Sequence, residues 1–177
     1  MEKPLWSHFV TLSEITRSSP KVDLVAEGAV RVAIARELGL ERLDSLVATV
    51  RTRPWMDGAE INGRLEAEVT QICSASGEPF EQTLTSDFTV RAVPKGSSAA
   101  PSEDIVEVDI DLESEDPPDV LEQDKVDLAA YVVEHLALEV DPFPRKPGAV
   151  FEPPVEENVI SPFSALNRLR GETPPKG

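Results

Sequence analysis

Two long runs in the middle of the chain alternate between apolar and polar residues. The first covers residues 61–73 and the second covers residues 80–92, with a Gly-Glu-Pro turn sequence at 77–79 between them. Alternation with a period of two places apolar side chains on one face of a strand and polar side chains on the other. The two runs therefore predict a long antiparallel hairpin with one buried and one solvated face, which commits the chain to a β-rich core.

Weaker patterns on either side of this hairpin predict further elements. Short strands are expected at 6–12 and 22–25, separated by a turn at 17–20, and a longer strand is expected at 43–53. Helical spacing of apolar residues predicts helices near 27–38 and 126–138, with Gly39 closing the first and Asp124 or Asp127 capping the second. The chain is therefore predicted to be α+β: a curved, mainly antiparallel sheet, either open or closed like a barrel, with two main helices.

The chain is expected to divide into one folded domain and a tail. Residues 1–140 are predicted to form a single α+β domain with a mobile loop near 95–104, and residues 141–177 a proline-rich extended tail. A short amphipathic helix is expected at 162–170, because Phe163, Leu166 and Leu169 recur three residues apart. So short a helix is marginal alone, so its apolar stripe is expected to dock on its own domain or, alternatively, on a partner.

The negative charge of the chain is concentrated in one third of its length. The formal net charge is −16, and residues 101–160 hold 18 acidic and 3 basic residues, a net of −15. The acidic segment 103–127 contains twelve carboxylates, and Asp109, Asp111 and Glu113 lie on or just after the polar side of a strand predicted at 106–112. Such a segment is either a solvated surface or a docking surface for a basic partner. An EF-hand calcium loop is excluded, because Ser114 and Val120 stand where glycine and glutamate are required.

No sequence motif indicates an enzyme, a metal site or a cofactor site. One cysteine and two distant histidines, His8 and His135, cannot supply a Cys-rich zinc site. His135 falls within an apolar helix and is interpreted as structural, and Cys73 as a small buried apolar residue. Neither a signal peptide nor an apolar stretch of about 20 residues is present, so we expect a cytoplasmic protein without a membrane anchor.

Direct RNA binding is a second hypothesis, although the net charge disfavours it. Arg51, Arg53, Arg64 and Arg91 all fall on predicted strands, and Arg64 and Arg91 share the solvated side of the hairpin. If the four side chains converge near Trp55, they would form a small platform for RNA. If they are dispersed, the hypothesis fails.

The turn of the hairpin carries a family resemblance. Its sequence from 71 to 80 reads Gln-Ile-Cys-Ser-Ala-Ser-Gly-Glu-Pro-Phe. It resembles the Cys-x-Arg-Cys-Leu-Glu-Pro-Phe pattern of the YceD-like family of large ribosomal RNA subunit accumulation proteins, and Cys73, Glu78, Pro79 and Phe80 match it. The segments at 141–145 (Asp-Pro-Phe-Pro-Arg) and 161–166 (Ser-Pro-Phe-Ser-Ala-Leu) also resemble the family, most closely its alphaproteobacterial branch.

The resemblance implies a role in the accumulation or processing of large-subunit ribosomal RNA, without an agreed catalytic activity. Ser76 stands where the family has its second cysteine, so a metal held by paired thiols elsewhere in the family would not be held here. We predict that the acidic segment binds a basic ribosomal protein or assembly factor by electrostatic steering, while naked RNA is repelled by it.

Overall fold

A computed structural model describes residues 5–101 and 116–151 of the 177-residue chain. The described residues form an α+β fold with three helices and seven strands. In chain order these are β1 (Phe9–Thr11), α1 (Leu12–Ser18), β2 (Lys21–Val25), α2 (Gly28–Glu37), β3 (Arg42–Trp55), β4 (Gly58–Ile72), β5 (Pro79–Pro94), β6 (Asp119–Leu121), β7 (Lys125–Asp127) and α3 (Leu128–Glu139). The predicted strand at 106–112 and the predicted helix at 162–170 lie outside the described residues.

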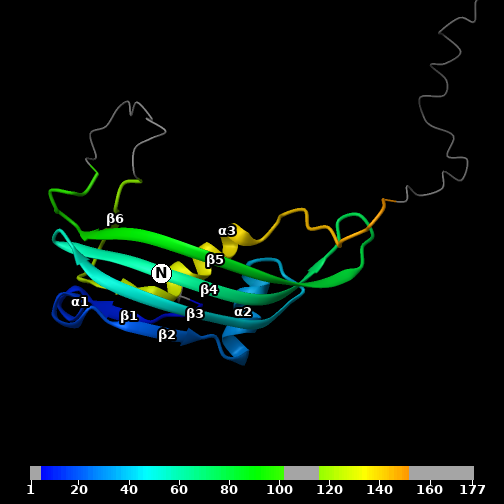
Figure 1. The fold of residues 1–177 in the computed structure, drawn as a ribbon, viewed down its shortest axis with the longest axis horizontal. Helices are drawn as coiled ribbons and strands as arrows, with labels where there is room; N and C mark the ends of the chain where they lie inside the picture. Colours follow the sequence, from blue (N-terminus) through cyan, green and yellow to red (C-terminus); the bar gives the residue numbers. More distant parts are fainter. Residues whose placement is uncertain (1–4, 102–115, 152–177) are drawn as a thin grey trace, which may run out of the picture.

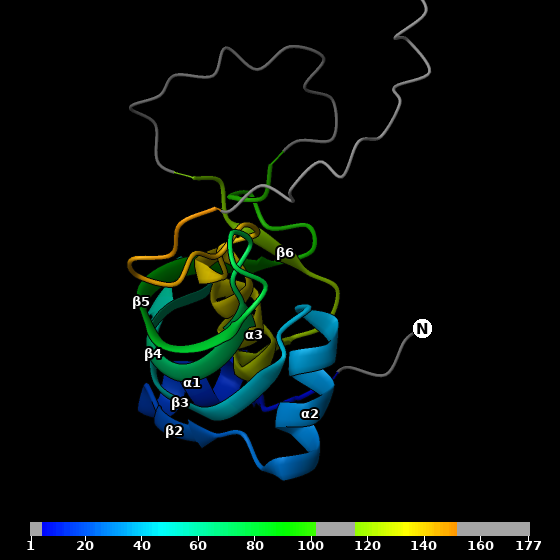
Figure 2. The same cartoon turned by 90° about the vertical axis from the view of Figure 1, so that its right-hand side faces the viewer.

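Five strands form one sheet in the order β2-β3-β4-β5-β6, antiparallel except for the β5–β6 pair (Figure 1). β4 and β5 pair without interruption from Ala59 opposite Ala92 to Ile72 opposite Pro79, which confirms the predicted hairpin. The sheet curves around α3 (Figure 2). Among the described strands, β2 and β6 remain as separate edges, so closure into a barrel was wrong as a prediction.

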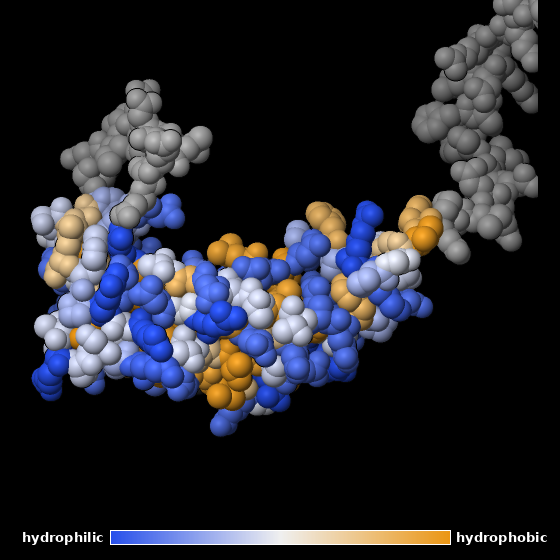
Figure 3. Space-filling model, in the orientation of Figure 1, coloured by the Kyte–Doolittle hydropathy of each residue, from blue (hydrophilic) through white to orange (hydrophobic). Residues whose placement is uncertain are grey.

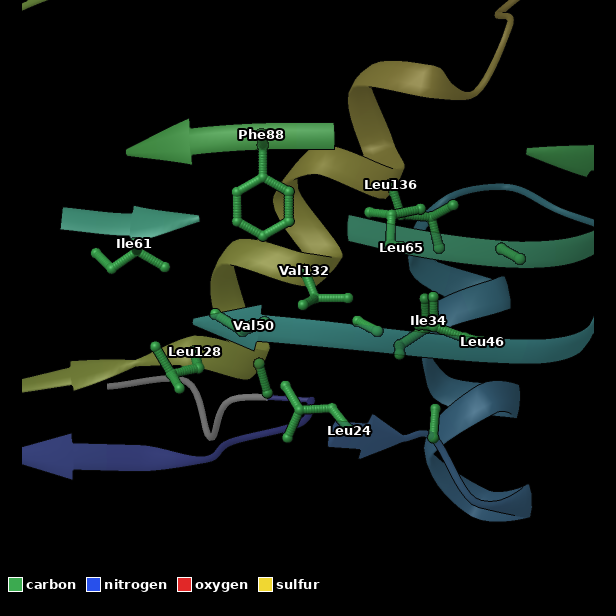
Figure 4. Close-up of a cluster of buried hydrophobic side chains, with 14 of the residues drawn as sticks. Leu24, Ile34, Leu46, Val50, Ile61, Leu65, Phe88, Leu128, Val132 and Leu136 are labelled. Carbon is green, nitrogen blue, oxygen red and sulfur yellow. The ribbon is translucent and has the colours of Figure 1, made fainter. Parts of the chain in front are cut away.

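The hydrophobic core lies between the concave face of the sheet and α3. Leu65 and Phe88 from the hairpin meet Val132 and Leu136 from α3, and α2 adds Ile34 at the side (Figure 4). These side chains alternate along the strands with exposed polar residues, because successive side chains of a strand point to opposite faces. The convex face of the sheet, here called the outward face, is turned toward the viewer in Figure 3 and is largely hydrophilic.

Gly63 of β4 has no side chain, and this lets the ring of Phe88 on β5 pack directly against its backbone. It lies directly opposite Phe88, whose ring covers the glycine backbone. A Cβ atom at position 63 would lie 2.0 Å from Cζ of Phe88. The same ring stacks on the imidazole of His135 in α3, with 4.1 Å between ring centres. Gly63 thus allows an aromatic ring to bridge the sheet and α3.

The two predicted helices are confirmed, and a third was missed. α2 and α3 lie where apolar spacing predicts them, and the Asp127 carboxylate caps α3 by accepting hydrogen bonds from the backbone N–H groups of Ala130 and His8. The predicted strand at 6–12 is confined to β1, and residues predicted as its end and the following turn form α1 instead. Thr11 and Glu14 form a reciprocal capping box that starts α1. No helix in the described ranges is long and apolar enough to cross a membrane.

Candidate functional site

The four arginines considered for RNA binding lie on the outward face, but only three of them are close together. Arg53 of β3 and Arg91 of β5 lie on either side of Glu60 of β4 in the same row of the sheet. Arg51 lies two residues before Arg53 on β3, opposite Asn62 of β4. Arg64 lies two rows from Glu60 and pairs with Asp87 at 3.2 Å, so it belongs to a separate ion pair.

Glu60 is a buried carboxylate that holds two of these arginines. Its side chain is only 4 % exposed, and its Oε1 accepts hydrogen bonds from Nε of Arg53 at 2.7 Å and Nδ2 of Asn62 at 2.9 Å. Nε of Arg91 lies 3.6 Å from Oε2, and the Arg91 guanidinium lies over the Trp55 ring at 5.1 Å. The hydrogen bond from Asn62, together with those from Arg53, lowers the pKa of Glu60. Glu60 therefore fixes the position of the Arg53 guanidinium and lies beside that of Arg91.

Sequence reasoning missed Glu60 because it lies just before the alternating run at 61–73 and belongs to no linear motif. The missing information was the register of the β3–β4 hairpin, in which Trp55 lies opposite Gly58 and Met56 adopts a left-handed φ of 50°. A two-residue turn at 56–57 places residue 53 opposite residue 60. The register therefore brings a glutamate between Arg53 and Arg91, from positions that no linear motif connects.

A hollow of about 630 Å³ lies beside this group, between the ends of β2, β3 and β4. We call it the basic hollow; its lining residues are Ser19, Lys21, Arg51, Thr52, Arg53 and Asn62. Lys21 contacts Asp23 at 3.4 Å and lies opposite Arg51 in the sheet. Arg51 forms no ion pair within 4.0 Å of any residue that the structure describes, although its charge, after hydrogen bonds from Thr49 and Lys21, helps to lower the pKa of Asp23. The hollow therefore presents three cations from two neighbouring strands.

The turn residues that match the family pattern form a second polar cluster, at the other end of the β4–β5 hairpin. Cys73 is 1 % exposed, as expected, but its Sγ is surrounded by hydrogen-bond donors rather than by apolar groups alone. The Ser76 hydroxyl and the backbone N–H groups of Lys146, Ser76 and Ala75 lower the pKa of the Cys73 thiol to about 6. The Lys146 N–H lies 3.3 Å from the sulfur. The cluster therefore favours a thiolate at neutral pH.

The other matched residues attach the segment after α3 to this turn. The Glu78 carbonyl accepts a hydrogen bond from the Cys73 N–H at 2.8 Å, and its carboxylate pairs with Nζ of Lys146 at 3.0 Å. Pro79 opens β5, and Phe80 is half-buried beside it. The turn thus positions the chain near Lys146, a contact that the sequence did not predict because 68 residues separate the partners.

A third group surrounds His135, at a hollow of about 390 Å³ shared with Arg91 and Asp119. Nδ1 of His135 lies 2.9 Å from the Tyr131 carbonyl oxygen, and its ring stacks on Phe88. The Tyr131 hydroxyl donates to Asp119 at 2.7 Å, and burial together with this carboxylate raises the pKa of Tyr131. These contacts hold the His135 ring against α3 and Phe88, and the Tyr131–Asp119 bond ties β6 to α3.

The acidic segment is described only from residue 116 onward, so Asp109, Asp111 and Glu113 lie outside the described residues, as do Phe163, Leu166 and Leu169. From residue 116 onward, carboxylates from β6, β7, α3 and the turn between β6 and β7 gather at a hollow of about 470 Å³. We call it the acidic hollow; Asp119, Glu122, Asp127 and Glu134 line it together with the rings of Phe9 and Tyr131. Lys125 also lines this hollow, with its amine 4.1 Å from the Phe9 ring centre.

The geometry provides no cluster of His, Cys, Asp or Glu residues arranged to hold a metal ion within ranges 5–101 and 116–151. No curated protein and no solved structure matches the chain. A family model described as "Large ribosomal RNA subunit accumulation protein YceD" matches residues 61–170, which include the Cys73 turn, the acidic segment and α3. Because this match covers more than half of the sequence, the chain belongs to the YceD family of large ribosomal RNA subunit accumulation proteins.

Proposed function

We propose that this chain is a non-enzymatic factor that supports the accumulation of large-subunit (23S) ribosomal RNA during ribosome biogenesis. The observation that carries the proposal is the family match over residues 61–170. We further propose that it acts in the cytoplasm through protein–protein contacts of its acidic segment. The partner is a basic ribosomal protein or an assembly factor with a basic surface.

The acidic hollow supports the choice of a basic partner. Glu122 and Glu134 are exposed at its rim, and the exposed ring of Phe9 provides apolar surface beside them. Lys and Arg side chains suit such a surface, because their apolar stems pack on aromatic rings while their charges meet carboxylates. Long-range attraction of this kind increases the association rate and decreases with ionic strength.

The cellular role is tested by depleting the protein in its source organism and measuring the two ribosomal RNAs. The proposal predicts that large-subunit RNA falls relative to small-subunit RNA, and that precursors of the large-subunit RNA accumulate. Affinity capture of the tagged full-length chain from the same cells is expected to recover large-subunit proteins or assembly factors. An unchanged RNA profile after depletion would contradict the proposed role.

The contact surface is tested by binding of the full-length chain to purified large-subunit components at low and high salt. We expect binding to weaken with salt and to weaken further in the variant Asp109→Asn/Asp111→Asn/Glu113→Gln. A matched control is Glu66→Gln/Glu68→Gln, which removes exposed charges from β4 on the outward face. Salt-insensitive binding, or equal loss in the control, would refute the role of the acidic segment.

A further inference from the structure

The basic hollow has a charge pattern that sets it apart from the rest of the outward face. No carboxylate is among the six residues that line it, whereas three of them are cations. Farther along the same face, toward the Cys73 turn, the exposed residues of β4 and β5 include Glu66, Glu68 and Glu81. A flexible anion that reaches this face is therefore attracted to the end where β2 and β3 present Lys21 and Arg51.

Arg53 is held in a fixed orientation at the border of this hollow. Its Nε and Nη2 both contact Oε1 of Glu60, at 2.7 and 2.6 Å, while its side chain remains 67 % exposed. A guanidinium carries more N–H groups than this contact uses, and the remainder are available to an anion. Because Glu60 already immobilises the side chain, binding by Arg53 loses less conformational entropy than binding by a free arginine.

We propose that the basic hollow, through Lys21, Arg51 and Arg53, binds phosphate groups of single-stranded RNA. Lys21 and Arg51 lie opposite each other on adjacent strands, and Arg53 follows Arg51 by one two-residue repeat. That repeat separates the two Cα atoms by about 6–7 Å, similar to the distance between neighbouring phosphates along an extended strand of nucleic acid. The arrangement therefore suits two successive phosphates.

The acidic surface that the structure describes does not prevent this binding. Asp119 lies on β6, at the opposite edge of the sheet from β2 (Figure 1). Three strand spacings separate β3 from β6, about 14 Å, whereas the screening length at physiological ionic strength is about 8 Å. The basic hollow and the described acidic surface thus act as separate sites, one for RNA and one for a basic protein.

The site also explains which of the four candidate arginines contact RNA. Arg51 and Arg53 line the hollow, whereas Arg64 is paired with Asp87 outside it. Arg91 stacks on Trp55 and contacts Glu60, so it acts through Glu60 as a positioning residue for Arg53. The choice of RNA as the ligand rests on the proposed role in ribosomal RNA accumulation.

The test measures binding of the full-length chain to a fluorescent single-stranded RNA oligonucleotide over a series of salt concentrations. We expect Lys21→Ala/Arg51→Ala to lose affinity by about tenfold or more at low salt. We also expect the slope of log affinity against log salt to fall by roughly 1.4, which is about 0.7 for each lost phosphate contact on a single strand. Arg51→Lys keeps the charge and is expected to keep most of the affinity.

Arg64→Ala is the matched control, because it removes an arginine from the same face outside the hollow. It is expected to change RNA affinity by less than about twofold, and unfolding temperatures should match among the variants, since the substituted side chains are exposed. Equal loss in Arg64→Ala, absence of saturable RNA binding at low salt, or binding only to vesicles of anionic phospholipid would overturn the proposal. These outcomes would leave the depletion phenotype intact, so the two proposals fail separately.

Discussion

The substitution Gly63→Ala tests whether the packing of Phe88 against the backbone of β4 is as close as the structure indicates. The added Cβ would lie 2.0, 2.3 and 2.6 Å from three atoms of the Phe88 ring. Carbon atoms in contact are ordinarily about 3.5–4.0 Å apart, so the ring has to move by about 1.5 Å. Such a shift moves the ring away from its position on His135.

The expected loss of stability follows from three contributions. Overpacking costs about 1–3 kcal/mol, and loss of the aromatic stacking costs about 0.5–1.5 kcal/mol. Replacing glycine by alanine in a strand recovers about 0.5–1 kcal/mol. We therefore expect Gly63→Ala to lower the free energy of unfolding by about 2 kcal/mol, and the unfolding temperature by about 4–8 °C for a chain of this size.

The assay is urea and thermal unfolding of the full-length chain followed by circular dichroism, with a double-mutant cycle. In a Phe88→Leu background the clash is relieved, so Gly63→Ala is expected to cost less than about 0.5 kcal/mol. Gly28→Ala is the matched control, because a Cβ there meets nothing within 4 Å and the residue starts α2. Equal destabilisation by Gly63→Ala in the wild-type and Phe88→Leu backgrounds would refute the reasoning.

Three further predictions concern polar contacts. Glu60→Gln is expected to lower stability by about 1–3 kcal/mol at neutral pH, because charge-assisted hydrogen bonds are lost. The pKa of Glu60 is lowered from 4.5, so its contribution is present above that value and disappears as pH falls through the folded pKa. Urea unfolding should therefore show wild type and variant converging in acid. The Cys73 thiol, with a pKa of about 6 instead of 9.0, is expected to show thiolate absorbance at neutral pH in the folded chain alone. Its contribution to stability is complete above 9.0 and is lost as pH falls through about 6, a dependence that Cys73→Ser should abolish in urea unfolding. Tyr131→Phe is expected to cost about 0.5–1.5 kcal/mol, and a cycle with Asp119→Asn should show that the two losses are not additive.

Local patterns in the sequence were sufficient for the long hairpin and for the two main helices. Alternation over residues 61–92 determines the register of inward residues, because a slip by one residue would expose every apolar side chain. α1 was missed although Thr11 and Glu14 carry its capping signal, because the apolar residues before it were interpreted as a strand that continued to residue 12. β6 and β7, each three residues long, depend on pairing with distant strands and leave little local signal.

The candidate sites depend on register and on long-range contacts, which a single sequence does not reveal. Arg51 and Arg53 were candidates because they fall on a predicted strand, but Glu60 and Lys21 join them only once β2, β3 and β4 are aligned. The donors around Cys73 come partly from Lys146, which is 73 residues away. The uneven distribution of charge, by contrast, could be predicted from the sequence alone, because counting charged residues separates a nearly neutral part of the chain from its acidic third.

The most direct test of the central claim is the ratio of large-subunit to small-subunit ribosomal RNA in cells depleted of this protein and rescued with variants. Re-expression of the wild-type chain is expected to restore the ratio, and Glu66→Gln/Glu68→Gln is expected to restore it equally. Asp109→Asn/Asp111→Asn/Glu113→Gln is expected to restore it only in part. A ratio that depletion leaves unchanged would contradict the account.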